Sequence, residues 1–165
     1  MRKATLVFLI NRDSNTICLG MKKRGFGALR WNGFGGKVNE DEDIEDAAIR
    51  EIYEETTDTQ QNEGVRIDKE DLERVAILNF TFPHQADWNQ QVHVFFVEKW
   101  NGNINESEEM KPEWFDIDEI PYSDMWSDDK YWLPRVIKGE RMIADFSFNE
   151  KDEMISNEIR DFPLS

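Results

Sequence analysis

One helical segment constrains this chain more than any other feature, because its inward-facing stripe changes chemistry halfway along. The segment Asp43–Thr57 is predicted to be a helix, and Asp43 is placed to cap its first turn. At about 100° per residue, one stripe of this helix begins apolar and ends in carboxylates: Ile44, Ala47, Ala48, Glu51, Glu54 and Glu55. Unpaired buried charge is costly, and like charges three or four residues apart repel each other.

Two interpretations of this acidic end stay open. The carboxylates can form a solvated face, although their place in the C-terminal turns opposes the helix dipole. Alternatively, a bound cation neutralises them, and oxygen ligands favour a hard ion such as Mg²⁺ or Mn²⁺. With two histidines and one cysteine in the chain, zinc ligation is not expected.

A glycine-rich loop precedes the helix. Gly33, Gly35 and Gly36 stand in the run RWNGFGGKV, and glycine allows the backbone to approach a ligand closely. An ordinary tight turn would explain them equally well. The loop is not a P-loop, because the lysine–serine/threonine ending is absent.

The remaining pattern predicts an α/β sandwich, in which a mixed sheet packs with two helices. Six segments have strand character: Ala4–Ile10, Thr16–Lys23, Glu73–Phe82, Gln91–Trp100, Pro112–Ile117 and Arg141–Phe148. Arg30–Val38 is expected to be a strand that enters a tight loop, and Asp128–Lys138 a second helix, kinked at Pro134. The length of 165 residues favours one domain, residues 1–148, followed by a polar, loosely attached tail, residues 149–165.

Composition restricts the partners and the compartment. A net charge of −15 disfavours binding to nucleic acid polymers or anionic membranes. The same charge would repel a nucleotide, so an anionic substrate would need a local cation. The sequence shows no signal peptide and no apolar run near the ~20 residues of a membrane span. Together with the single cysteine, Cys18, this predicts a cytoplasmic protein.

The order of these residues resembles a known family. The Nudix box, G-x5-E-x7-R-E-U-x-E-E-x-G-U with U a bulky apolar residue, is matched at Gly36, Glu42, Arg50, Glu51, Ile52, Glu54 and Glu55. Thr57 and Asp58 depart from it, which suggests an altered helix end. The stretch Thr59–Asp71 looks like a surface insertion. Beyond the box, GMKKRGFGALRWNGFGGKV and DMWSDDKYW resemble the MutT-type members that act on oxidised purine nucleoside triphosphates.

The resemblance implies an α/β/α sandwich and an Mg²⁺-dependent hydrolase, with Mn²⁺ as a possible substitute. Substrates such as 8-oxo-dGTP or 2-oxo-dATP would yield a monophosphate and pyrophosphate, which sanitises the nucleotide pool and prevents DNA damage. A monomer is expected. The implied metal ligands, of which the helical glutamates are also catalytic, are Glu51, Glu54, Glu55, Glu109 and the Gly36 carbonyl, with Arg50 and Glu42 as structural box residues. The implied substrate-binding residues are Lys22, Asn32, Phe80, Trp126, Asp128 and Asp129.

Elementary chemistry agrees with a base-reading role for part of this set. Asn32 offers a donor and an acceptor in one plane, and Trp126 can stack on a base. If Asp128 and Asp129 both face a semi-enclosed pocket, one of them can stay protonated. The alternative is that the aspartates cap a helix and the tryptophan belongs to the core.

Two departures leave the base preference open: Gln90 stands where an apolar residue is expected, and Ser127 where proline is expected. Other readings also stay open at this level. They are a Nudix hydrolase of another nucleoside diphosphate derivative or of unoxidised triphosphates, a catalytically silent nucleotide sensor, and an acidic interaction module.

Overall fold

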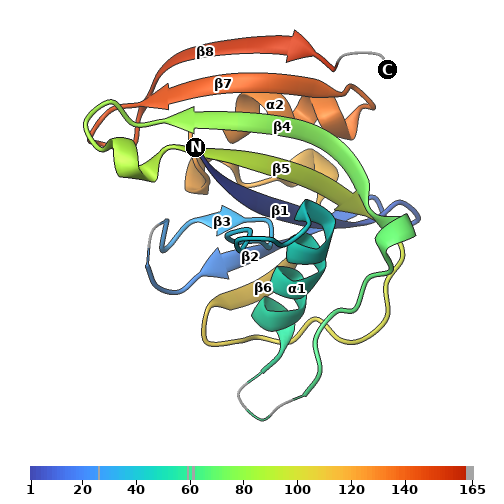
Figure 1. Ribbon diagram of the computed structural model, residues 1–165. Coiled ribbons are helices and arrows are strands. Elements are labelled where there is room, and N and C mark those ends of the chain that lie inside the picture. Colours follow the sequence, from blue (N-terminus) through green and yellow to red (C-terminus); the bar gives the residue numbers. More distant parts are fainter. Residues whose placement is uncertain (26, 59, 61, 163–165) are drawn as a thin grey trace.

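The chain forms one mixed β-sheet with a helix on each face (Figure 1). The structure, a computed structural model, describes residues 1–25, 27–58, 60 and 62–162. The strands are β1 (Arg2–Asn11), β2 (Thr16–Lys22), β3 (Trp31–Asn32), β4 (Glu73–Thr81), β5 (Gln90–Val97), β6 (Met110–Asp116), β7 (Met142–Phe148) and β8 (Met154–Asp161). Their order is β3-β2-β1-β5-β4-β7-β8, and β6 also pairs with β2. The pairs β1–β5 and β4–β7 are parallel and the other pairs antiparallel, so the predicted mixed sheet is confirmed.

Two apolar layers hold the helices against this sheet. Helix α1 (Ile44–Thr56) packs on the face to which Val7 and Leu9 point, and helix α2 (Asp129–Ile137) packs on the face of Phe8. Strand β1 is therefore buried on both sides, which explains its unbroken apolar sequence. The α/β/α sandwich is confirmed. Short 3-10 turns at Lys69–Asp71, Ala86–Trp88, Ile117–Glu119 and Tyr122–Asp124 connect other elements. Within the described residues, no helix has the length and apolar character to cross a bilayer.

The glycine loop is fastened to β1 by its backbone. Strand β3 covers only Trp31–Asn32, so the loop makes up most of the predicted strand-and-loop segment Arg30–Val38. The residues after it run along β1, where Thr5 N donates to the Gly36 carbonyl at 2.9 Å. A Cβ atom on Gly35 would lie 1.7 Å from the Thr5 carbonyl oxygen, so only glycine fits there.

The polar C-terminal segment is part of the sheet, which corrects the predicted tail at residues 149–165. Strand β8 pairs antiparallel with β7 along its whole length, and it forms the outer edge of the sheet in Figure 1. Only Met154 and Ile159 of β8 are partly buried against the core, so this edge strand lacks the apolar alternation that reveals other strands. Residues 163–165 lie outside the described part of the chain.

The predicted surface insertion at Thr59–Asp71 also needs correction. Residues 59 and 61 are outside the described part, but Val65 and Ile67 are buried in the layer beneath α1. Arg66 forms a bridge with Asn101 through paired backbone hydrogen bonds of 2.8 and 3.0 Å. This half of the segment therefore closes the core next to the end of α1.

Candidate active site

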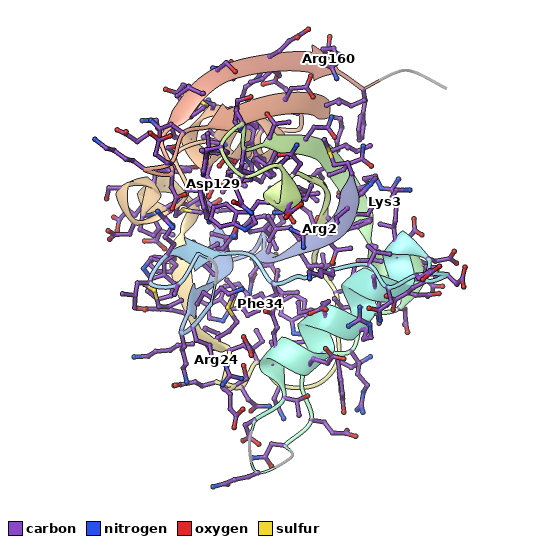
Figure 2. All side chains as sticks on the ribbon, turned by 60° about the vertical axis from the view of Figure 1, so that its left-hand side comes forward. Arg2, Lys3, Arg24, Phe34, Asp129 and Arg160 are labelled. Carbon is purple, nitrogen blue, oxygen red and sulfur yellow. The ribbon has the colours of Figure 1, made fainter. Side chains whose placement is uncertain are left out.

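A cavity of about 420 Å³ extends from the glutamate end of α1 to the start of α2. All six predicted substrate-binding residues line it: Lys22, Asn32, Phe80, Trp126, Asp128 and Asp129. Glu55 and Gly36 line it as well, from the acidic end. Figure 2 labels two of the lining residues, Asp129 on α2 and Arg2 at the start of β1. The volume is within the range of small-molecule sites, about 300–1,000 Å³.

Glu55 is the most buried carboxylate of the acidic end, with 8% of its surface exposed. Its Oε1 accepts a hydrogen bond of 2.8 Å from Gly35 N. Burial raises the pKa of Glu55 to about 8, and the nearby carboxylates of Glu51 and Glu109 add to the rise. The Gly35 N–H and the Lys22 ammonium oppose that rise only in part. The ionised form of Glu55 would therefore be stabilised by a bound cation.

Arg50 fixes the next carboxylate. Its Nη1 donates to Glu51 at 2.9 Å, and its Nε donates to Glu42 at 2.8 Å. Its Nη2 donates to the Lys37 carbonyl at 2.9 Å, which ties α1 to the glycine loop. Burial raises the pKa of Glu51, and the hydrogen bond from Arg50 works in the opposite direction. Arg50 therefore orients Glu51 and braces the loop at the same time.

The other two predicted metal ligands lie farther out. The Glu54 side chain is 56% exposed and lies 3.4 Å from Arg50 Nη1. Glu109, just before β6, pairs with Arg24 at 2.8 Å. Among the described residues, no three acidic, histidine or cysteine side chains form a ready-made metal cage. Arginine contacts hold Glu51 and Glu109 instead.

The donor set nevertheless suits a hard divalent cation. A Cβ atom on Gly36 would lie 2.4–2.6 Å from the Glu51 carboxylate, so the absence of a side chain lets glutamate and loop backbone share one small space. The available ligand atoms there are carboxylate and carbonyl oxygens, which Mg²⁺ and Mn²⁺ prefer. Glu51 and Glu55 would be the inner protein ligands, with Glu54 and Glu109 at the rim.

The opposite end of the cavity holds two buried aspartates. Asp128 and Asp129 are 1% and 3% exposed. Asp128 stands at the N-cap position of α2, but its side chain makes no cap hydrogen bond. Trp132 Nε1 donates to Asp128 Oδ2 at 2.7 Å, whereas Asp129 Oδ2 has no hydrogen-bond partner. The capping alternative is therefore wrong for Asp128.

Burial disfavours the charged form of both carboxyl groups and raises their pKa values. It raises the pKa of Asp128 to about 6, although the Trp132 hydrogen bond lowers it. The pKa of Asp129 lies well above its usual range because of burial and the adjacent Asp128 charge. Such a pair can share one proton, which would place a hydrogen-bond donor beside an acceptor.

Aromatic and amide side chains complete the walls. Asn32 Oδ1 accepts from Gly33 N at 2.9 Å, which fixes the plane of its amide group. Phe80 and Gln90 are register partners on β4 and β5, and both line the cavity. Gln90 thus brings a polar group to a wall that was expected to be apolar.

Some site residues had no signal in the sequence. Phe148 lines the cavity from the end of β7. The alternation of apolar residues along this strand predicts that its side chain is buried, but not that it lines a cavity. Arg2 and Lys37 line the rim, although both were unremarkable cations in the sequence. Arg30 lies over the Trp126 ring at 4.2 Å and pairs with Asp152, a residue of the supposed tail.

Comparison with known proteins identifies the family to which the chain is similar. The family model described as the NUDIX domain matches residues 1–136. The chain is 41% identical over 160 residues to the oxidized purine nucleoside triphosphate hydrolase of Mus musculus, covering 97% of this chain and 95% of the relative. It is 40% identical over 155 residues to the protein of the same name from Danio rerio, covering 94% and 92% of the two chains.

Solved structures agree on the fold. The MutT protein of Bacillus halodurans superimposes with a TM-score of 0.81, at 22% identity, covering 99% of this chain and 100% of the other. A MutT Nudix hydrolase from Burkholderia pseudomallei superimposes with a TM-score of 0.61, also at 22% identity, covering 73% and 86%. At these identities the likeness concerns the fold alone.

Proposed function

The chain belongs to the Nudix hydrolase family, and from that membership we propose that it hydrolyses purine nucleoside triphosphates carrying an oxidised base. The products would be the nucleoside monophosphate and pyrophosphate. One observation carries the proposal: a single cavity joins the acidic end of α1 to a buried aspartate pair that can donate and accept hydrogen bonds. The relatives named for this activity are about 40% identical over nearly the whole chain.

The aspartate pair provides the base selectivity. Oxidation of a purine at C8 converts N7 from an acceptor into a donor and adds an oxygen at C8. An ionised carboxylate facing N7 meets a donor only in the oxidised base, and a protonated one can donate to an oxygen. Because a mismatched base would leave buried polar groups unpaired, such a site can discriminate strongly.

Three cations adapt this acidic protein to an anionic substrate. Arg2, Lys22 and Lys37 line the cavity, and in the part of the chain that the structure describes none of them forms an ion pair. They would contact the phosphates and offset the repulsion from the net charge of −15.

The acidic end would hold Mg²⁺, with Mn²⁺ as a substitute, through Glu51, Glu55, Glu54, Glu109 and the Gly36 carbonyl. When bound, such a cation neutralises phosphate charge and makes water more acidic. The chain itself contributes position and proton transfer. Arg50 holds Glu51 beside the loop, Gly35 N–H holds Glu55, and one helical glutamate accepts the proton of the attacking water.

A substrate panel tests the proposal. Pyrophosphate release should be measured with 8-oxo-dGTP, 2-oxo-dATP, dGTP, dATP and an ADP-sugar, with Mg²⁺ and with excess EDTA. We expect kcat/KM to favour an oxidised purine, and turnover to vanish in EDTA. Preference for unoxidised triphosphates or for the ADP-sugar would assign a different substrate within the Nudix family. No turnover of any substrate would favour a catalytically silent nucleotide sensor.

The Asp129→Asn variant tests base reading directly. It keeps the shape of a buried side chain but cannot present a carboxyl proton, so we expect kcat/KM for the preferred oxidised substrate to fall at least about tenfold more than that for dGTP. Stability should be unaffected or improved, because a buried carboxyl group is replaced by a neutral one. An unchanged ratio of oxidised to ordinary rates would remove Asp129 from base reading.

A further inference from the structure

We propose that Arg30 and Asp152 form a clamp that fixes the Trp126 ring, so that the turn between β7 and β8 is part of the base-recognition machinery. The inference rests on the proposed function, because it takes Trp126 as the surface on which the purine stacks. It assigns a positioning role to a segment whose sequence resembles a loose tail.

The first contact is a cation over an aromatic ring. The Arg30 guanidinium carbon lies 4.2 Å from the Trp126 ring centroid, within the distance of about 6 Å for a cation–π interaction. Trp126 lines the cavity and Arg30 does not. The guanidinium therefore contacts the ring from outside the cavity lining.

The second contact holds the guanidinium in place. Arg30 Nη2 lies 3.3 Å from Asp152 Oδ2, and each side chain is only 29% exposed. Asp152 adopts a left-handed backbone conformation with φ of 59°, and Asn149 Oδ1 accepts from Lys151 N and Glu153 N at 2.9 and 3.0 Å. Such a conformation persists when its surroundings determine it, so the turn presents Asp152 in a fixed place.

Two further contacts connect the ends of the turn to the same wall. Phe148, the last residue of β7, meets the Trp126 ring edge-on at a centroid distance of 5.6 Å. Met154 N, at the start of β8, donates to Ser127 Oγ at 3.2 Å. Proline, which is expected at position 127 from the family resemblance, has no hydroxyl group for this bond. This chain therefore adds a tie between the turn and the residue beside Trp126.

A clamp of this kind affects binding more than chemistry. A ring already held in its binding orientation loses little freedom when a base stacks on it. The acidic end of α1, where the phosphates would bind, lies at the other end of the cavity. Loosening the clamp should therefore weaken base binding and raise KM, with little change in kcat.

The experiment uses binding of 8-oxo-dGMP, which lacks the scissile bond, together with steady-state hydrolysis of 8-oxo-dGTP. For Arg30→Met and Asp152→Asn we expect binding about 5- to 20-fold weaker, a fraction of what a base–aromatic stack contributes. KM should rise in parallel, with kcat within about twofold of the wild type. Asp152→Glu, which keeps the charge for Arg30, should restore most of the affinity. Wild-type affinity in both clamp variants would overturn the inference.

Two controls separate the clamp from a general loosening. Asp145→Asn removes the 2.7 Å ion pair between Asp145 on β7 and Arg160 on β8. The Asp145 side chain points to the opposite face of the sheet from Phe148, so this variant should leave 8-oxo-dGMP binding unchanged. In a Trp126→Ala background, Arg30→Met should cause no further loss, because its effect acts through the ring. Equal losses from Asp145→Asn, or a full additional loss in the Trp126→Ala background, would contradict the clamp. Failure of the wild-type protein to bind 8-oxo-dGMP and to hydrolyse 8-oxo-dGTP would instead overturn the proposed function.

Discussion

Glu55 carries a conflict between stability and function. Its side chain is buried near two other carboxylates, yet its proposed role requires it to be ionised. In the metal-free protein its pKa is raised to about 8 from 4.5, so the folded state binds this proton more tightly than the unfolded state. Stability from this group is therefore fully present below pH 4.5 and is lost as pH rises through about 8.

Glu55→Gln should relieve this cost and remove the activity. In EDTA at pH 8.5 we expect the variant to be more stable than the wild type by at least about 1 kcal/mol, roughly 2–4 °C in Tm. At pH 5 the difference should shrink. Turnover should fall at least about 10²-fold, the usual scale for loss of a catalytic acid or base. Thermal melts at both pH values and pyrophosphate release measure the two effects.

Glu54→Gln is the matched control, because its side chain is 56% exposed. Its Tm in EDTA should follow the wild type at both pH values. Equal melting of the Glu55→Gln protein and the wild type at pH 8.5 would show that Glu55 is not a buried charge in solution.

At the scale of elements, Arg50 makes α1 and the glycine loop a single unit. One guanidinium reaches Glu42, Glu51 and the Lys37 carbonyl, at distances from 2.8 to 3.0 Å. Only the planar fork of arginine can make these bonds together, whereas lysine offers one compact ammonium group. The connection between α1 and the glycine loop therefore depends on the geometry of the Arg50 guanidinium as well as on its charge.

Arg50→Lys should separate geometry from charge. We expect turnover or apparent Mg²⁺ affinity to fall about 10- to 100-fold, as with other residues that orient metal ligands. Pyrophosphate release against Mg²⁺ concentration measures the change. Arg135→Lys is the control. Arg135 on α2 makes an exposed ion pair with Glu140, far from the acidic end of α1, so this variant should leave the Mg²⁺ dependence unchanged. Wild-type Mg²⁺ dependence in Arg50→Lys would rule out the orienting role.

Strand β8 is the second element whose removal is informative. A chain ended at Phe148 would expose the unpaired backbone groups of β7, a template for aggregation. We expect Tm to fall by at least about 5 °C, corresponding to roughly 1–2 kcal/mol, with greater light scattering on heating. A chain ended at Phe162 is the control, because it keeps all of β8. If both shortened chains melt like the full chain, residues 149–162 are a dispensable tail after all.

At the scale of the whole molecule, a net charge of −15 has to be reconciled with an anionic substrate. Within the cavity, Arg2, Lys22 and Lys37 supply positive charge, and the acidic end is suited to a bound cation. Both features offset the repulsion between the protein and an anionic substrate. The remaining surface stays acidic, which opposes binding to nucleic acid polymers.

Mg²⁺ should therefore stabilise the folded protein specifically. A ligand that binds only the native state adds about 2.7 kcal/mol at one hundred times its Kd. We expect Tm to rise with MgCl₂ in the wild type and much less in Glu51→Gln, while NaCl at equal ionic strength controls for screening of the net charge. An equal rise in both proteins, or a rise matched by NaCl, would show that no specific site exists.

The sandwich fold and the acidic end of α1 are predictable from the sequence pattern. Strand β1 and helix α1 are predictable because apolar periodicity reflects which faces are buried. The pairing of Gly36 with Glu51 was expected from the family resemblance, whereas helical spacing alone placed Glu51 on the inward stripe of α1. Trp126 and the aspartate pair were found only through the family resemblance, because local chemistry allowed capping and core roles equally well.

Other features of the site and the fold depend on residues that are distant in sequence, so they become visible only in the folded protein. The raised pKa values of Asp128 and Asp129 follow from burial, which no local pattern specifies. Strand β8 is defined by the exposed edge of β7 rather than by its own polar residues. The contact of Arg30 with Asp152 joins residues 122 positions apart, and only the folded sheet brings them together beside Trp126.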